Sequence, residues 1–125
     1  MAKRACPRGW HLPNDSEWLK LVQFLGGWKN AGGKMRLSEG WEKASPEWNN
    51  SSGFSALPGG RGSYTSIGIG VYEKKGVVGF WWTSSESGLD SRPPFYFLDS
   101  SDNNRIYRNN ALTNQQFSVR CLKDK

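Results

Sequence analysis

The cysteines and histidines, which most often supply nucleophiles, catalytic bases and zinc ligands, are few: Cys6, Cys121 and His11. A catalytic nucleophile needs a base within reach, usually a histidine oriented by an acid. His11 lies just before a predicted helix, so packing or hydrogen bonding at the helix entry is its favoured role. Zinc sites need several Cys or His ligands at close spacing, and the sequence lacks them. We therefore expect no enzymatic activity and no cofactor or metal.

Three other short motifs resemble binding loops only superficially. The stretch Asp-Ser-Ser-Asp-Asn at residues 99–103 is rich in oxygen ligands but lacks the spacing of an EF-hand calcium loop. The glycine clusters at residues 59–62 and 68–70 are not followed by the lysine and helix of a phosphate-binding loop. We expect the two glycine clusters to form turns, and we expect residues 99–103 to bind no metal.

The two cysteines lie close to opposite ends of the chain, which favours one disulfide that closes almost all of it. On the chain-entropy account, such a long loop contributes about 4 to 5 kcal/mol. Two buried thiols are the alternative. A disulfide implies an oxidising compartment. Residues 1–5 are too short and too charged for a signal peptide, so we expect the sequence to be part of a larger exported protein.

The composition of the 125 residues predicts a single domain, residues 1–125, with an aromatic core. Only 36% of residues are hydrophobic, yet the chain holds seven Trp, six Phe and four Tyr, each of which buries a large area. The net charge is +6, and the basic residues are scattered along the chain among acidic ones. This distribution favours a mildly cationic surface over a nucleic-acid site. No apolar run approaches the roughly 20 residues of a membrane span. We expect a monomeric domain that binds no nucleic acid and inserts into no membrane.

The strongest secondary-structure signal is a helix that follows Asn14. Asn14 and Glu17 have the spacing of a capping box, and an apolar face repeats at helical intervals until a Gly-Gly pair at residues 26–27; that face consists of Trp18, Leu21, Val22 and Leu25. A shorter helix is expected at residues 31–37. Later apolar runs separated by turn residues predict strands at residues 54–57, 79–83, 95–98, 105–108 and 117–122. Helices followed by strands indicate the α+β class.

Several blocks of the sequence, taken in order, resemble the Fibrobacter succinogenes major paralogous domain. They are Cys-Pro-Arg-Gly-Trp-His-Leu-Pro at residues 6–13, Gly-Phe-Ser-Ala-Leu-Pro-Gly-Gly-Arg at 53–61, Phe-Trp-Trp-Thr-Ser-Ser-Glu at 80–86 and Phe-Ser-Val-Arg-Cys at 117–121. The resemblance extends from Cys6 to Asp124. It implies a C-type lectin-like fold, related to that of formylglycine-generating enzymes. In such a fold, one or two N-terminal helices pack on short twisted antiparallel sheets with long loops, and the termini are adjacent.

The resemblance also implies exported bacterial proteins, often lipid-anchored or displayed at the cell surface, in which this domain is C-terminal. The cysteine pair matches only the terminal pair of the family, so formylglycine-generating activity is not expected. The sugar-binding loops of calcium-dependent C-type lectins are missing: Trp-Thr-Ser at residues 82–84 departs from their Trp-Asn-Asp strand. Calcium-dependent sugar binding is therefore not expected.

Similar domains are the variable proteins of diversity-generating retroelements, in which Asn-rich late strands and loops are diversified. The segment 87–116 suits that role, because Tyr offers rigid contact area and Asn offers adaptable hydrogen bonds. The alternative is that Asn and Ser only mark turns between strands. The candidate ligand contacts are Tyr96, Asp99, Asn103, Asn104, Arg105, Tyr107, Arg108, Asn109, Asn110 and Asn114.

The tryptophans are expected to serve mainly the core. Trp10, Trp18 and at least one of Trp81 and Trp82 lie in periodic or strand-like segments. The other three, Trp28, Trp41 and Trp48, lie in turns or polar loops, where packing is favoured over stacking on a ligand.

The leading hypothesis is a non-enzymatic recognition domain of a surface or secreted bacterial protein, with a protein or glycan as its ligand. The alternatives are a structural capping or spacer module of a surface lipoprotein and a carbohydrate-binding module. Near-identical copies that differ mainly within residues 87–116 would favour recognition, whereas uniform copies would favour a structural role.

Overall fold

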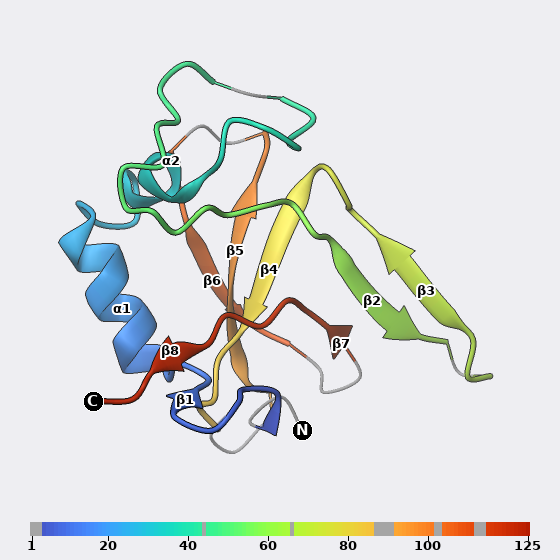
Figure 1. Ribbon diagram of the computed structural model, residues 1–125. Helices are drawn as coiled ribbons and strands as arrows, with labels where there is room; N and C mark the ends of the chain where they lie inside the picture. The colour runs from blue at the N-terminus through green and yellow to red at the C-terminus, as the bar shows by residue number, and fades with distance from the viewer. Residues whose placement is uncertain (1–3, 44, 66, 87–91, 102–103, 112–114) are drawn as a thin grey trace.

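A computed structural model describes residues 4–43, 45–65, 67–86, 92–101, 104–111 and 115–125 (Figure 1). Its helices are α1 (Asp15–Phe24) and α2 (Ala31–Met35). Its strands are β1 (Trp10–His11), β2 (Arg61–Tyr64), β3 (Gly70–Glu73), β4 (Val78–Trp82), β5 (Pro94–Asp99), β6 (Tyr107–Asn110), β7 (Gln115–Gln116) and β8 (Leu122–Lys123). All strand pairs within the sheets are antiparallel, which confirms an α+β architecture with short antiparallel sheets.

Helix α1 begins where the capping residues predict. The side chain of Asn14 accepts the backbone N–H of Glu17 at 2.8 Å, and the Glu17 carboxylate accepts the N–H of Asn14 at 3.1 Å. Two backbone N–H groups at the helix start are thereby satisfied. Trp18 and Val22 are fully buried, as the helical periodicity predicted.

Helix α2 is shorter than expected and depends on its glycines. A Cβ on Gly32 would lie 2.4 Å from the carbonyl oxygen of Arg105, and Gly32 donates its N–H to the carbonyl of Asn104 at 2.8 Å. The two glycines that weaken α2 as a helix are therefore what allows residues 104–105 to pack against it. The prediction that the helix reaches residue 37 is wrong, because Arg36 has extended backbone angles.

The central sheet has the strand order β4-β5-β6, and both of its faces are covered by aromatic side chains. On one face, Trp81 and Tyr96 are paired across β4 and β5 and pack against Trp18 of α1, which lies along that side of the sheet (Figure 1). On the other face, Phe80 and its neighbours form a second cluster with Trp82, Phe95, Phe97 and Phe117. Every residue of β4 is buried.

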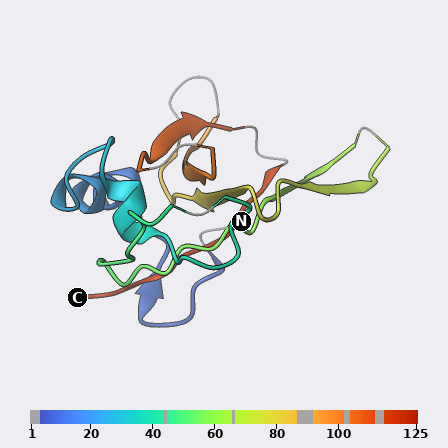
Figure 2. The same cartoon turned by 90° about the horizontal axis from the view of Figure 1, so that it is seen from above.

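A second sheet has the order β3-β2-β7, and its β2–β3 hairpin projects away from the rest of the molecule (Figure 2). This hairpin was not predicted from the sequence, because strands β2 and β3 each contain a glycine and bury no apolar side chain. The short β1–β8 pair was not predicted either. The predicted strand at 54–57 is wrong, since Ala56 makes only an isolated bridge to Arg36. The expected strand at 117–122 is likewise reduced to a bridge at Ser118 and the start of β8.

Cys6 and Cys121 form the predicted disulfide, with Cα atoms 5.7 Å apart. Strand β1 pairs with β8 beside it, with Trp10 opposite Lys123. The two ends of the chain are therefore adjacent, as expected. Among the described helices, none is long and apolar enough to cross a membrane.

The tryptophans follow the expectation with one exception. Trp18, Trp81 and Trp82 lie in the core, and Trp41 and Trp48 are buried in loops that were expected to pack. Trp10 is 45% exposed, so its assignment to the core is wrong; it lies in the two-residue strand β1 at the periphery.

Candidate ligand-binding face

Strand β6 carries most of the predicted contact residues, and it lies at the edge of the central sheet. Successive side chains of a strand point to opposite faces. Tyr107 and Asn109 therefore share the face of Phe97 and Phe95, with which they are paired, whereas Arg108 shares the opposite face with Tyr96. The structure thus divides the predicted residues into two groups.

The first group forms an aromatic and cationic surface. The Tyr107 ring stacks on Phe97 with centroids 5.0 Å apart, and the Arg105 guanidinium lies 5.7 Å from the centre of the Tyr107 ring. Tyr107 is only partly buried, and Arg105 is exposed. The structure therefore brings together two of the predicted contact residues, Arg105 and Tyr107.

A polar pocket of about 300 Å³ adjoins Asn109 and Asn110 between the two sheets. Side chains of the second sheet form its other wall, and two phenylalanines of the core contribute to its lining. These additional lining residues are Arg61, Ser63, Glu73, Phe95, Ala111, Gln115 and Phe117. The Arg61 guanidinium is held by the Glu73 carboxylate at 2.7 Å. This wall was not foreseen from the sequence because the β2–β3 hairpin was not predicted.

The second group does not face this pocket. Tyr96 is completely buried between the rings of Trp18 and Trp28, with centroids 4.9 and 6.0 Å away. Its hydroxyl donates to the Asp15 carboxylate at 2.8 Å, and burial raises the pKa of that hydroxyl well above its usual value. The prediction that Tyr96 is an aromatic anchor for a ligand is therefore wrong: its place in β5 is opposite Trp81, on the face covered by α1.

Arg108 is not a free donor either. Its guanidinium donates to both carboxylate oxygens of Asp15, at 2.8 and 2.9 Å. This pairing lowers the pKa of Asp15 and raises that of Arg108. Arg108 thus links the edge strand to the start of α1.

Asp99, at the end of β5, and Asn104, in the loop between β5 and β6, form hydrogen bonds within the protein. The Asp99 carboxylate accepts the backbone N–H and the hydroxyl of Ser101, at 2.9 and 2.8 Å. The Asn104 amide donates to Glu47 at 2.8 Å. Asn103 and Asn114 lie outside the described residues.

The loop between β5 and β6 is held by Arg36, which was not singled out from the sequence. This fully buried arginine donates to the carbonyls of Asp99 and Arg105, at 2.7 and 3.1 Å. Its guanidinium lies 5.0 and 4.4 Å from the ring centres of Trp41 and Trp48. An arginine directly after a buried helix and near two loop tryptophans is a weak sequence signal for such a cation–π site.

His11 has the structural partners of a side chain at a helix entry. Its ring nitrogens lie 2.9 Å from the Glu17 carboxylate and 2.6 Å from that of Asp124. Hydrogen bonding to Glu17 first, and then to Asp124, raises the pKa of His11. His11 thereby connects β1, α1 and the C-terminal segment. Among the residues that the structure describes, no group of three or more His, Cys, Asp or Glu side chains has the arrangement of a metal site.

The sequence was compared with protein families, curated proteins and solved structures. The family model of the Fibrobacter succinogenes major domain matches residues 1–123. No curated protein and no solved structure matches this sequence.

Proposed function

This chain belongs to the Fibrobacter succinogenes major domain family, and from that premise we propose that it is a non-enzymatic recognition domain. Its ligand contacts are Arg105 and Tyr107 at one end of β6, and Asn109 and Asn110 with the polar pocket at the other. The fold is proposed to be C-type lectin-like, because a helix packs on a short antiparallel sheet and a disulfide joins the ends of the chain.

The pocket of about 300 Å³ beside Asn109 is the observation that carries this proposal. Each Asn or Gln amide offers both donors and an acceptor, and the Arg61–Glu73 pair adds a cationic and an anionic group. These groups suit a polar ligand that is oriented by hydrogen bonds, such as a glycan or a polar protein surface.

The disulfide supports a location outside the cytoplasm, since oxidising compartments favour disulfides. The exposed side chains of β6 also suit diversification. Asn109 and Asn110 are exposed on opposite faces of the strand. Substitutions there would leave the buried residues of β4 and β5 unchanged.

The test is a binding screen of the intact chain on a printed glycan array and, in parallel, on a panel of purified bacterial surface proteins. Tyr107→Ala and Asn109→Ala are expected to abolish any binding found. Asn49→Ala is the matched control, because its exposed amide likewise accepts only a local backbone N–H. Binding retained by both variants would overturn the assignment of the face, and so would a failure to bind any probe.

A further inference from the structure

The face of the β2–β3 hairpin opposite the polar pocket carries two exposed tyrosines. Tyr72 is 75% exposed and Tyr64 is 52% exposed. Within β2, Arg61 and Ser63 point toward the polar pocket, so Gly62 and Tyr64 point the other way.

Each of these tyrosines is paired with a glycine on the neighbouring strand: Tyr64 lies opposite Gly70, and Tyr72 lies opposite Gly62. A Cβ on Gly62 would lie 2.8 Å from Cε1 of Tyr72, and one on Gly70 would lie 3.6 Å from the same ring. The Tyr72 ring therefore covers both glycines, and any larger residue at Gly62 would displace it. The result is a flat aromatic surface backed by bare main chain.

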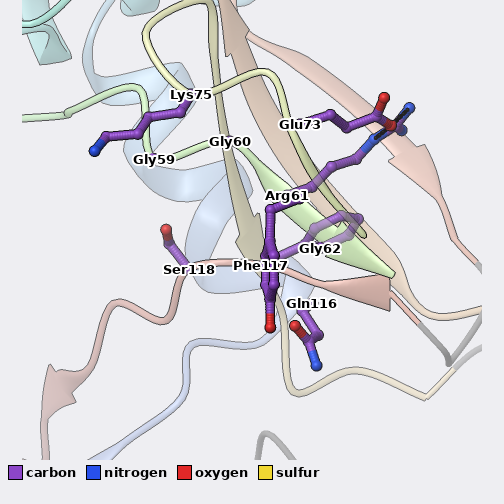
Figure 3. Close-up of a pocket in the computed structure, with 10 residues that line it drawn as sticks. Gly59, Gly60, Arg61, Gly62, Glu73, Lys75, Gln116, Phe117 and Ser118 are labelled. Carbon is purple, nitrogen blue, oxygen red and sulfur yellow. Dashed lines mark hydrogen bonds and ion pairs between the residues drawn. The ribbon is translucent and has the colours of Figure 1, made fainter. Parts of the chain in front are cut away.

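This surface adjoins a second pocket, of about 580 Å³, which is drawn in Figure 3. Arg61, Glu73 and Phe117 line this pocket as well as the polar pocket. Gly59, Gly60 and Gly62 line it together with Tyr72. Its polar groups come from Gln116 and Ser118 on the C-terminal segment and from Lys75 after β3. A Cβ on Gly62 would lie 2.6 Å from Oε1 of Gln116, so the amide of Gln116 and the ring of Tyr72 lie side by side.

The charged side chains that line this second pocket are Arg61, Glu73 and Lys75. The Glu73 carboxylate already binds the Arg61 guanidinium at 2.7 Å. In Figure 3 the Lys75 side chain extends on the other side of the pocket, away from this pair and beside Gly59. An anionic group of a ligand would therefore be favoured near Lys75.

We propose that this glycine-backed tyrosine face and its adjoining pocket bind an extended acidic saccharide chain. A pyranose ring has an apolar C–H face, which matches the electron-rich face of a tyrosine ring. Its hydroxyl rim matches the amide of Gln116 and the hydroxyl of Ser118, each of which donates and accepts hydrogen bonds. Tyr64 is two residues from Gly62, the partner of Tyr72, so it lies about 7 Å further along the hairpin. A second sugar ring of the same saccharide contacts Tyr64. The carboxylate of a uronate residue pairs with Lys75.

The two pockets share Arg61, Glu73 and Phe117 in their linings, but Tyr72, Lys75, Gln116 and Ser118 line only the second pocket. This proposal rests on these four residues and on Tyr64, and it does not depend on the proposed function. The two proposals can fail separately, because Tyr107 and Asn109 belong only to the first site.

The test is titration calorimetry of the intact chain with hexagalacturonate and with the neutral cellohexaose, at millimolar concentrations and low salt. Hexagalacturonate is expected to bind more tightly than cellohexaose. Tyr72→Ala should lower the affinity for hexagalacturonate by about fivefold or more, the loss expected for one aromatic contact. Lys75→Gln should remove the preference for the acidic chain, and Tyr72→Phe should retain most of the affinity.

Gly62→Ala provides the sharpest variant, because the three atoms nearest to the added methyl group all belong to side chains, those of Tyr72 and Gln116. It should displace both groups and reduce binding while the thermal midpoint stays close to that of the parent chain. Tyr107→Ala is the control from the other site and should bind both probes normally.

Two results would overturn the proposal. One is unchanged binding in both Tyr72→Ala and Gly62→Ala. The other is the absence of binding to either saccharide, including the case in which size-exclusion chromatography shows that the exposed tyrosines mediate self-association instead.

Discussion

The guanidinium of Arg108 donates to both oxygens of the Asp15 carboxylate, so an edge strand near the end of the chain is tied to the first turn of the first helix. The same carboxylate accepts the hydroxyl of the buried Tyr96. Asp15 also lies where negative charge is favoured by the helix dipole. One carboxylate thus connects α1, β5 and β6.

The Asp15 carboxylate should give the protein acid-dependent stability. Its pKa in the folded state is held below the ordinary value of an aspartate, chiefly by the hydrogen bonds from Arg108. Such a group stabilises the fold above its unfolded pKa, and this stabilisation is lost as the pH falls through the folded pKa. Asp15→Asn should therefore cost about 1 kcal/mol of unfolding free energy near neutral pH, as expected for a partly exposed pair.

Denaturant unfolding of the parent chain and Asp15→Asn near neutral pH and in mild acid, about one unit below the pKa of an unfolded aspartate, measures this effect. The difference between the two proteins should shrink at the lower pH. Glu39→Gln, which changes an exposed carboxylate in the loop after α2, is the control. An equal difference at both pH values would contradict the assignment.

Gly32 should tolerate no side chain, because a Cβ there would lie 2.4 Å from the backbone oxygen of Arg105. Gly32→Ala requires α2 or the main chain at residues 104–105 to move, and overpacking of this kind costs about 1 to 3 kcal/mol. Thermal and denaturant unfolding measure the loss. Gly70→Ala is the matched control, since its new Cβ would meet only the Tyr72 ring at ordinary contact distances. Equal stability of the two variants would contradict the close contact between Gly32 and the main chain of residues 104–105.

The disulfide should dominate the stability of the domain. Cys6 and Cys121 are 115 residues apart, and closing such a loop contributes about 4 to 5 kcal/mol on the chain-entropy account. Cys6→Ser/Cys121→Ser should therefore unfold at much lower denaturant concentration than the parent chain. Reductant should destabilise the parent and leave the double variant unaffected. Intact mass after alkylation under native and denaturing conditions gives an independent check, because two labelled thiols in unreduced protein would exclude the bond.

His11 should titrate with a pKa above the ordinary value of a histidine, because Glu17 and Asp124 both hold its protonated ring. A raised pKa in the folded state contributes stability that is complete below the unfolded pKa and is lost as the pH rises through the folded pKa. NMR titration of the His11 ring should show a lower pKa in Asp124→Asn than in the parent chain. Asp124 is preferred to Glu17 for this test because Glu17 also caps α1. An unchanged His11 pKa would contradict the contact.

The prediction of α1 succeeded because its signals are local. The capping pair Asn14 and Glu17 and the buried residues Trp18 and Val22 all lie within a few turns of one another. The β2–β3 hairpin was missed for the opposite reason. Its glycines are explained only by the side chains that lie across them from neighbouring strands, such as Tyr72 and Gln116 over Gly62.

The candidate site was predicted in part. Arg105, Tyr107, Asn109 and Asn110 lie in or beside the exposed strand β6, where the composition of the segment placed them. Tyr96 has a residue type equally suited to a ligand contact, but β5 is the middle strand of its sheet and α1 covers it. Exposure depends on strand order, and strand order is not encoded within any short window of sequence.

The sequence by itself determined the family, the terminal disulfide, the first helix and the exposure of Arg105, Asn109 and Asn110. Each of these depends on residue type, local spacing or a pair of unique residues. Only the tertiary structure decided that Arg108 binds Asp15, that Arg36 holds the loop between β5 and β6, and that the β2–β3 hairpin adds a wall to one pocket and a tyrosine face to another. These contacts join residues far apart in the chain, so they arise from how the sheets and helices pack and not from any local pattern.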